Sequence, residues 1–134
     1  MSCKRTLRWS IPICWFILII FLSTQSGEDS GKLSLWIAEH LIGDVPPESV
    51  HIFIRNAAHF GTHFVLAALT YIAAKPDLKK PPLFCLVACS IVAICDETIQ
   101  CLIPGRYLEL TDISLNLLGI IAAILSCVII DKRT

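Results

Sequence analysis

Four long stretches of apolar residues alternate with polar segments of unequal length along the chain. The stretches cover residues 7–23, 57–74, 83–101 and 113–130. Each is close to the ~20 residues that an α-helix needs to cross ~30 Å of hydrocarbon. Helices are expected because lipid offers no partner to an unpaired backbone, and four short segments cannot close a barrel. The pattern therefore predicts an all-α membrane protein, a bundle of four transmembrane helices.

The segments between the stretches predict two short turns and one longer loop. Residues 75–82 combine lysines with prolines, and residues 103–106 read Ile-Pro-Gly-Arg, so both are typical of turns. The loop of residues 25–56 has apolar positions at helical spacing: Leu33, Trp36, Ile37 and Leu41. This spacing predicts an amphipathic helix lying in the headgroup region. No repeat or change of composition divides the chain, so residues 1–134 are expected to form one domain.

The first stretch also has features of a signal peptide, because basic residues precede its apolar core. Residues 23–26 make a poor cleavage site, however, and Trp9 and Trp15 suit a membrane interface. A retained first helix is therefore expected.

The composition favours a lipid environment over a soluble fold. Hydrophobic residues make up 55% of the 134 residues, charged residues 16%, and the mean hydropathy is +0.72. A soluble domain of this length could not bury so much apolar surface, so the bilayer is the expected partner. The formal net charge is zero, which gives no reason to expect a nucleic acid. The oligomeric state does not follow from the composition.

The distribution of basic residues predicts the orientation in the membrane. With the N-terminus inside, most of the basic residues are cytoplasmic: Lys4, Arg5, Arg8, Lys75, Lys79, Lys80, Lys132 and Arg133. Only Lys32, Arg55 and Arg106 are then outside. The positive-inside rule therefore predicts that both termini lie in the cytoplasm.

The seven cysteines are expected to be reduced. Five lie within apolar stretches, where a free cysteine acts as a small hydrophobic residue, and are expected to be buried: Cys14, Cys85, Cys89, Cys95 and Cys127. Cys101, at the edge of a stretch, is expected to be accessible.

Polar residues in or beside the stretches gather at one predicted face of the membrane. They are Ser23, Gln25, Arg55, His59, His63, Asp96, Glu97, Gln100, Arg106, Asp112 and Asn116. In the predicted topology all of them lie at the outer ends of the four spans. Ionisable groups in a span are costly, so this gathering indicates a functional site.

The spacing of these residues also predicts which helix faces are buried. Arg55, His59 and His63 recur every fourth residue and form one stripe. A second stripe runs through polar and then small residues: Asp112, Asn116, Gly119 and Ala123. Ala57 and Gly61 form a further pair of small residues. Small residues allow helices to approach closely, so all of these faces are predicted to point into the bundle.

Electrostatics predict a partner for the adjacent acids Asp96 and Glu97. Both lie in the last turn of a predicted helix, where the helix dipole disfavours a carboxylate by about 0.3–1 kcal/mol. Arg55 and Arg106 are the cations nearest in the topology. At least one ion pair between these arginines and the two acids is therefore expected.

Several simpler explanations stay open for individual residues. Asp112 is also suited to stabilising the N-terminus of the fourth span. His59 and His63 are each suited to hydrogen bonds between helices, as are Gln100 and Asn116. A metal site of the two histidines with an acid is chemically possible, but the HExxH signature is absent, and no metal or other cofactor is predicted. If the protein is an enzyme, which the sequence leaves open, the catalytic candidates are His59, Asp96 and Glu97.

Together these motifs resemble the VanZ-like family of bacterial membrane proteins. The resemblance rests on Leu22-Ser23-Thr24-Gln25-Ser26, Arg55-Asn-Ala-Ala-His59-Phe60, Asp96-Glu97-x-x-Gln100, Pro104-Gly105-Arg106 and Asp112-x-x-x-Asn116-x-x-Gly119. It covers nearly the whole chain, in the family's order and spacing. One departure is His63, where the family often has a tyrosine.

The resemblance implies a multi-pass protein of the bacterial inner membrane with four helices. The founding member of the family is associated with resistance to the glycopeptide teicoplanin. The motif residues that the resemblance carries over are Gln25, Arg55, His59, Asp96, Glu97, Gln100, Arg106, Asp112 and Asn116.

Three hypotheses of function follow. The leading one is that Arg55 and Arg106 hold the anionic headgroup of an amphiphile, a lipid-linked or lipoglycopeptide-like molecule of the cell envelope, with His63 among the ligand-binding residues. The alternative is a membrane-embedded transferase or hydrolase that acts on a lipid-linked envelope precursor. In that enzyme His59 and Asp96 or Glu97 would be acid and base, or metal ligands. The third is that the polar residues only specify the packing of the helices.

Overall fold

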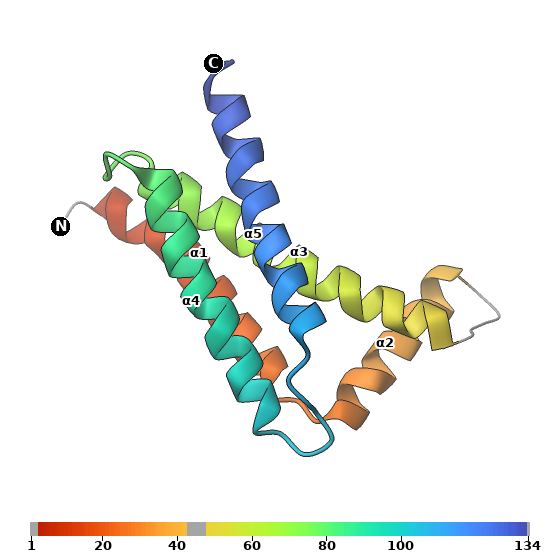
Figure 1. The fold of residues 1–134 in the computed structure, drawn as a ribbon. Coiled ribbons are helices and arrows are strands. Elements are labelled where there is room, and N and C mark those ends of the chain that lie inside the picture. The colour runs from red at the N-terminus through yellow and green to blue at the C-terminus, as the bar shows by residue number, and fades with distance from the viewer. Residues whose placement is uncertain (1–2, 43–47, 134) are drawn as a thin grey trace.

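The computed structural model describes residues 3–42 and 48–133, and every regular element in these ranges is an α-helix. The helices are α1 (Cys3–Ser23), α2 (Gly27–Ile42), α3 (Glu48–Ala74), α4 (Pro81–Cys101) and α5 (Leu110–Asp131) (Figure 1). Four of them are long and apolar enough to cross a membrane: Lys4–Ser23, Ile52–Ala74, Pro81–Cys101 and Leu110–Asp131. The prediction of an all-α protein with four apolar spans and a further amphipathic segment is confirmed.

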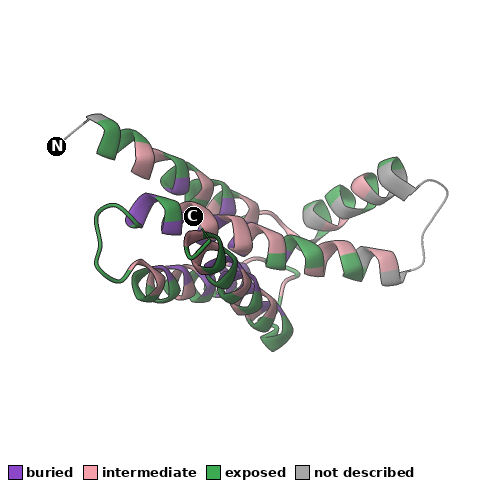
Figure 2. Cartoon of the chain, turned by 90° about the horizontal axis from the view of Figure 1, so that it is seen from above, coloured by how far each residue is buried: buried purple, intermediate pink, exposed green. Residues whose placement is uncertain are grey.

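The helices extend beyond the apolar stretches at their N-terminal ends. The largest difference is at α3, which begins at Glu48, nine residues before the stretch of residues 57–74. Hydropathy marks only the part of a helix that suits lipid, whereas backbone hydrogen bonds continue through polar residues. α2 and the polar start of α3 project together on one side of the bundle (Figures 1 and 2).

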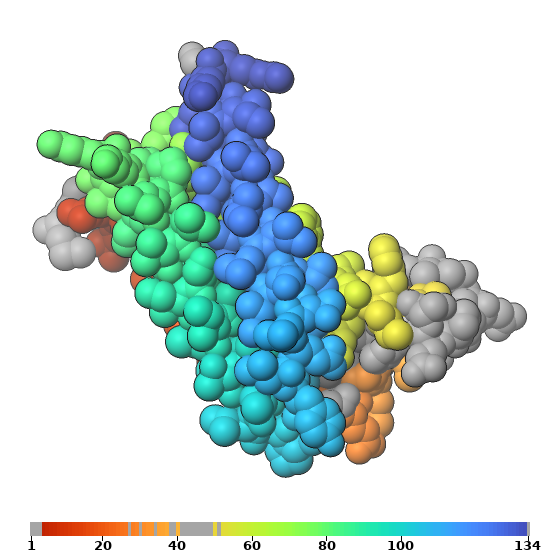
Figure 3. All heavy atoms as spheres, viewed as in Figure 1, coloured from red at the N-terminus to blue at the C-terminus, as the bar shows by residue number. Residues whose placement is uncertain are grey.

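The bundle is organised around the crossing of α3 and α5. α5 packs against α3 and α4, and α1 packs against the same two helices. Figure 3 shows the atoms of α4 and α5 packed side by side. At the crossing, a Cβ on Gly119 would lie only 2.3 Å from the carbonyl oxygen of Phe60. Glycine is therefore what allows the two backbones to approach so closely.

The predicted stripe on α5 is buried, but the small pair on α3 is not. Gly119 and its neighbours in the stripe, Asp112, Asn116 and Ala123, are all buried. Ala57 is exposed, and a Cβ on Gly61 would meet no atom within 4 Å. The prediction for Ala57 and Gly61 is wrong because each lies two residues from His59. Two residues correspond to about 200° around a helix, so these positions are opposite the buried stripe.

Large apolar side chains cover the outside of the bundle. Ile17, Ile91 and Leu125 are each more than half exposed. The described core, by contrast, is a narrow seam of mostly small and medium side chains such as Ala67, Ala93 and Ile120 (Figure 2). An apolar exterior around a narrow core is what lipid favours and water disfavours.

The cysteines follow the same division between seam and exterior. The six described cysteines are free, and Cys85 and Cys89 are buried, whereas Cys127 is half-buried. Cys14 and Cys95 are exposed on the helix surfaces, so the expectation that they would be buried is wrong. An apolar stretch predicts a helix in lipid, and a helix in lipid exposes one face of its apolar residues. Cys101 is exposed, as expected.

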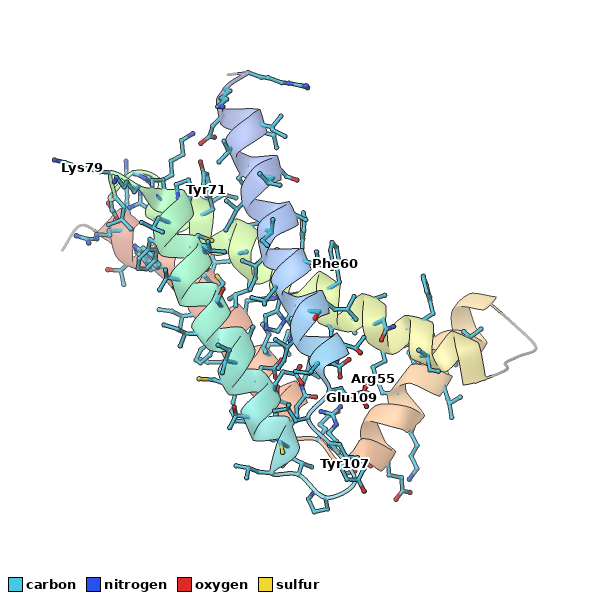
Figure 4. The ribbon with its side chains drawn as sticks, viewed as in Figure 1. Arg55, Phe60, Tyr71, Lys79, Tyr107 and Glu109 are labelled. Carbon is cyan, nitrogen blue, oxygen red and sulfur yellow. The ribbon has the colours of Figure 1, made fainter. Side chains whose placement is uncertain are left out.

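Ionic contacts hold the helices at the end of the bundle that carries most of the basic residues. Asp77, in the turn between α3 and α4, pairs with Arg5 at 3.2 Å and with Arg8 at 2.8 Å. A hydrogen bond from the Trp9 indole, together with Arg8, lowers the pKa of Asp77. Tyr71, labelled in Figure 4, donates a 2.9 Å hydrogen bond to Asp131 at the end of α5. These contacts join α1 to the turn after α3, and α3 to α5.

Candidate functional site

A cluster of buried polar side chains lies where α1 and α4 end, α5 begins and α3 passes between them. It comprises Ser23, His59, His63, Asp96, Glu97, Gln100, Asp112 and Asn116, and we call this set the polar cluster. Each member is at most 9% exposed. These residues come from four helices, and they lie together at one end of the bundle.

Asp96 joins the ends of α1 and α4. The hydroxyl of Ser23 lies within hydrogen-bond distance of Oδ1 of Asp96 and of the carbonyl oxygen of Ile19. The side-chain amide of Gln100 donates to the same Oδ1 at 3.1 Å. Gln100 is one helical turn after Asp96, so α4 itself presents both groups on one face. The carboxylate is thereby held in a fixed position.

Glu97 joins α4 to α3 and α5. The side-chain amide of Asn116 donates to Oε1 of Glu97 at 3.0 Å, and Nδ1 of His59 lies 3.4 Å from the same oxygen. Among the described residues, Oε2 of Glu97 and Oδ1 of Asn116 have no hydrogen-bond partner. Buried acceptors without a partner are uncommon in native proteins, so each one requires an explanation such as a bound water or ion.

Arg55 joins α3 to the start of α5. Its guanidinium lies 2.5 Å from Asp112 and 3.2 Å from Glu109. Arg55 and Glu109 are labelled in Figure 4. Arg55 therefore pairs with these two acids and not with Asp96 or Glu97. Glu109 was missed because it lies outside the apolar stretches. The sequence did contain a signal for Glu109: it precedes Asp112 by three residues, about one helical turn, and so lies on the same side of α5 as Asp112.

Asp112 lies at the N-terminus of α5 and also contacts α3. It lies in the first turn of α5, where the helix dipole favours a carboxylate. It is also 1% exposed and contacts two residues of α3: Arg55, and His59, whose Nε2 is 3.4 Å away.

His63 completes the stripe on α3. Its side chain is fully buried, and its Nδ1 lies 3.3 Å from the carbonyl oxygen of His59. Its Nε2 lies 3.8 Å from Asp96. Along α3, the three basic side chains thus face three acids from other helices in order: Arg55 faces Asp112, His59 faces Glu97, and His63 faces Asp96.

A pocket of about 140 Å³ opens onto this cluster. Its polar lining is Ser23, Gln25, Arg55, His59, Thr62, Asp96, Gln100 and Arg106. Its apolar lining is Ile19, Leu22, Leu33, Ile37, Ile54 and Ala58. Glu97, Asp112, Asn116 and His63 are not among the lining residues; they lie deeper and contact residues that are.

The amphipathic helix α2 forms one wall of the pocket. Leu33 and Ile37, one turn apart, line it. Trp36 points elsewhere, being 57% exposed with its ring 4.2 Å from the ring of His40. The side chain of Leu41 lies outside the part of the chain that the structure describes. The apolar face predicted for residues 33–41 is therefore divided between the pocket and the exterior.

Arg106 lies in the turn between α4 and α5 and reaches the pocket. Its pKa is lowered, mainly by burial and then by the charge of Arg55, while the carboxylates of the cluster act in the opposite direction. The same turn contains Gly105, whose φ of +79° is the conformation that favours glycine. The chain therefore turns at Gly105, immediately before Arg106.

Three residues of the site could hold a metal ion. His59, Asp96 and Glu97 each present one ligand atom, and these atoms lie within 4.8 Å of one another. Imidazole and carboxylate groups are common ligands of divalent transition metals.

Four apolar spans around a buried polar cluster define the class: a polytopic membrane protein with a polar site at one end of its helix bundle. The sequence profile of one family, VanZ/LLP1, matches residues 9–131. The chain belongs to the VanZ/LLP1 family. Searches of curated proteins and of solved structures gave no significant match.

Proposed function

We propose that the pocket binds the headgroup of an amphiphilic molecule of the bacterial cell envelope. The observation that carries this proposal is the division of the pocket lining into a polar side and an apolar side. Ligand sites usually combine an apolar lining with a few polar groups that fix orientation. In this arrangement the polar side holds the headgroup, and the apolar side accepts the start of a chain.

The proposed location is the outer leaflet of the inner membrane. Most basic residues lie at the end of the bundle opposite the pocket, with Arg8 and Lys75 as examples. The positive-inside rule assigns that end, with both termini, to the cytoplasm. The pocket then opens toward the external face, where envelope precursors and acylated antibiotics are found.

The charges of the site favour a headgroup that is recognised by hydrogen bonds over the anionic headgroup expected from the sequence. Arg55 is engaged by Asp112 and Glu109, and the carboxylates of the region outnumber its guanidinium groups. A purely anionic headgroup would meet repulsion from Asp96, which lines the pocket. Lipid-linked sugars and acylated glycopeptides, which are rich in hydroxyl and amide groups, fit this lining better. A contribution to teicoplanin-type resistance would follow from binding such a molecule.

The test compares variants at the two ends of the bundle. A deletion host expresses the wild type, Arg106→Ala or Lys79→Ala at matched levels, and envelope lipids that co-purify with each protein are measured by mass spectrometry. Teicoplanin sensitivity is scored in parallel. We expect Arg106→Ala to lose at least about tenfold of the bound lipid, the loss expected when one charge-assisted hydrogen bond is removed. Lys79→Ala, an exposed change far from the pocket, should retain it. An unchanged lipid content in Arg106→Ala would refute the proposal.

A second candidate, a transferase or hydrolase for a lipid-linked precursor, is favoured by one observation. His59 lies 3.4 Å from Glu97, and both side chains are buried, which suits an acid–base pair. On this hypothesis the purified wild type converts the lipid that it binds, and His59→Ala binds the lipid without converting it. Binding by the wild type with no product would exclude catalysis on that lipid.

A further inference from the structure

We propose that His59, Asp96 and Glu97 form a binding site for one divalent transition-metal ion at the base of the pocket. This deepens the proposed function, because the ion would face the headgroup. The candidate ligand atoms of the three residues lie within 4.8 Å of one another, and Nδ1 of His59 and Oε1 of Glu97 are 3.4 Å apart. Two ligands bound tetrahedrally at 2.0–2.2 Å lie about 3.4 Å from each other. This pair is therefore already at the separation that a shared ion requires.

The orientation of His59 presents the correct nitrogen. Its Nε2 lies 3.4 Å from a carboxylate oxygen of Asp112. A proton on Nε2 faces that carboxylate, which leaves the lone pair of Nδ1 directed toward Glu97. A carboxylate behind a metal-binding histidine is the usual arrangement in such sites, since it fixes the tautomer and the ring orientation.

Buried atoms without partners supply an independent argument. Glu97 is 1% exposed, and among the described residues its Oε2 has no hydrogen-bond partner. A carboxylate oxygen removed from water without a partner is costly, and the cost increases in a membrane-spanning helix. A metal ion at Oε1 that Glu97 binds through both of its carboxylate oxygens would also satisfy Oε2.

Hydrogen bonds from neighbouring side chains hold the two proposed carboxylate ligands in place. Ser23 and Gln100 hold the carboxylate of Asp96, and Asn116 holds that of Glu97. Asp96 and Glu97 together bring two negative charges, which one divalent ion offsets. Arg55 and Arg106 both lie in the same region, so their positive charges offset part of the negative charge of the site before the ion binds.

The ligand set leaves a coordination position on the pocket side. Three protein ligands do not fill a tetrahedral or octahedral shell, and His59 and Asp96 both line the pocket. A hydroxyl, carbonyl or phosphate oxygen of a headgroup could take this position. One imidazole with two carboxylates suits Zn²⁺ or Mn²⁺.

The test uses the purified full-length protein in nanodiscs, stripped of metal and titrated with MnCl₂ and with ZnCl₂ in the absence of lipid ligand. We expect one ion per chain by calorimetry and by elemental analysis. Glu97→Gln and His59→Ala should each lower the affinity at least about 100-fold, the upper end of the loss caused by outer-shell changes alone. His40→Ala, at an exposed histidine on α2, should bind normally.

Cysteines are the principal competing ligands, so Cys89→Ala serves as a second control. Co²⁺ added to the wild type should give the absorption spectrum of nitrogen and oxygen ligands, without a thiolate charge-transfer band. Circular dichroism and gel filtration establish that Glu97→Gln folds; if it does not, His59→Asn replaces it. Absence of stoichiometric binding by the wild type, or equal affinity in Glu97→Gln or His59→Asn, would overturn the proposal. A protein that binds metal but no envelope lipid would refute the proposed function alone.

Discussion

At the scale of single residues, the polar cluster is a set of pairings between α3 and the other spans. Each basic side chain in the buried stripe of α3 faces an acid from another helix, with Arg55 opposite Asp112 as the most direct case. The residue types and their spacing could be predicted from the sequence. The partner of each one could not, because a partner depends on how each helix is rotated about its own axis. Arg55, one of the two arginines considered as a partner for Asp96 or Glu97, pairs instead with Asp112 and Glu109.

Asn116 provides a test of how much the cluster contributes to stability. Asn116→Ala removes the amide that donates to Glu97 and leaves a buried carboxylate oxygen with one fewer partner. We expect the free energy of unfolding to decrease by about 1–3 kcal/mol. The measurement is equilibrium unfolding in mixed micelles, followed by circular dichroism.

The matched control is Ser114→Ala, on the exposed side of the same helix. Ser114 donates only to the carbonyl oxygen of Leu110, and its loss should change the free energy by less than about 0.5 kcal/mol. Equal effects of the two substitutions would mean that the hydrogen bond to Glu97 contributes nothing specific.

At the scale of helices, the crossing of α3 and α5 sets the geometry of the site. Gly119 is the position at which the α5 backbone approaches the backbone of Phe60. One turn earlier on α5, Asn116 reaches Glu97, and one turn before that, Asp112 reaches Arg55. A shift at the crossing would therefore move both contacts.

Two glycine substitutions separate this packing role from a general effect on helices. In Gly119→Ala the added methyl group would lie 2.3 Å from the Phe60 carbonyl oxygen, so α3 and α5 must separate. We expect a loss of about 1–3 kcal/mol in the free energy of unfolding, the range for overpacked sites. Gly61→Ala meets no atom within 4 Å and should be neutral or stabilising by up to about 1 kcal/mol, since alanine favours helix.

The same unfolding measurement in micelles decides between these outcomes. The expected order of stability is Gly61→Ala, at or above the wild type, then Gly119→Ala. If Gly119→Ala were as stable as the wild type, α3 and α5 would not cross at this position.

At the scale of the whole molecule, the two ends of the bundle differ in chemistry. One end carries exposed basic residues with ion pairs such as Arg8 with Asp77, and the other contains the polar cluster and the pocket. The apolar exterior between them matches a bilayer. The proposed orientation, with the pocket outside, makes a prediction for accessible thiols.

Cys101 lies exposed at the pocket end and reports the orientation directly. In a chain that retains only this cysteine, we expect a membrane-impermeant maleimide to label Cys101 in spheroplasts with intact membranes. A cysteine introduced by Lys79→Cys in an otherwise cysteine-free chain should react only after permeabilisation. The reverse pattern of labelling would place the pocket in the cytoplasm and exclude an external ligand.

The sequence by itself determined the four apolar spans and the end of the bundle at which the polar residues gather. Both are local properties. Each segment must be long and apolar enough by itself to cross the hydrocarbon, and the constant rise of a helix relates the number of a residue to its position along the helix axis. Only the tertiary structure decided which faces meet. Ala57 and Gly61 are small residues spaced four apart, as Gly119 and Ala123 are. They are not buried, however, because the face of α3 that packs against the other helices is the one with His59. Helix rotation and partner choice depend on the packing of all the spans together, and no single segment contains that information.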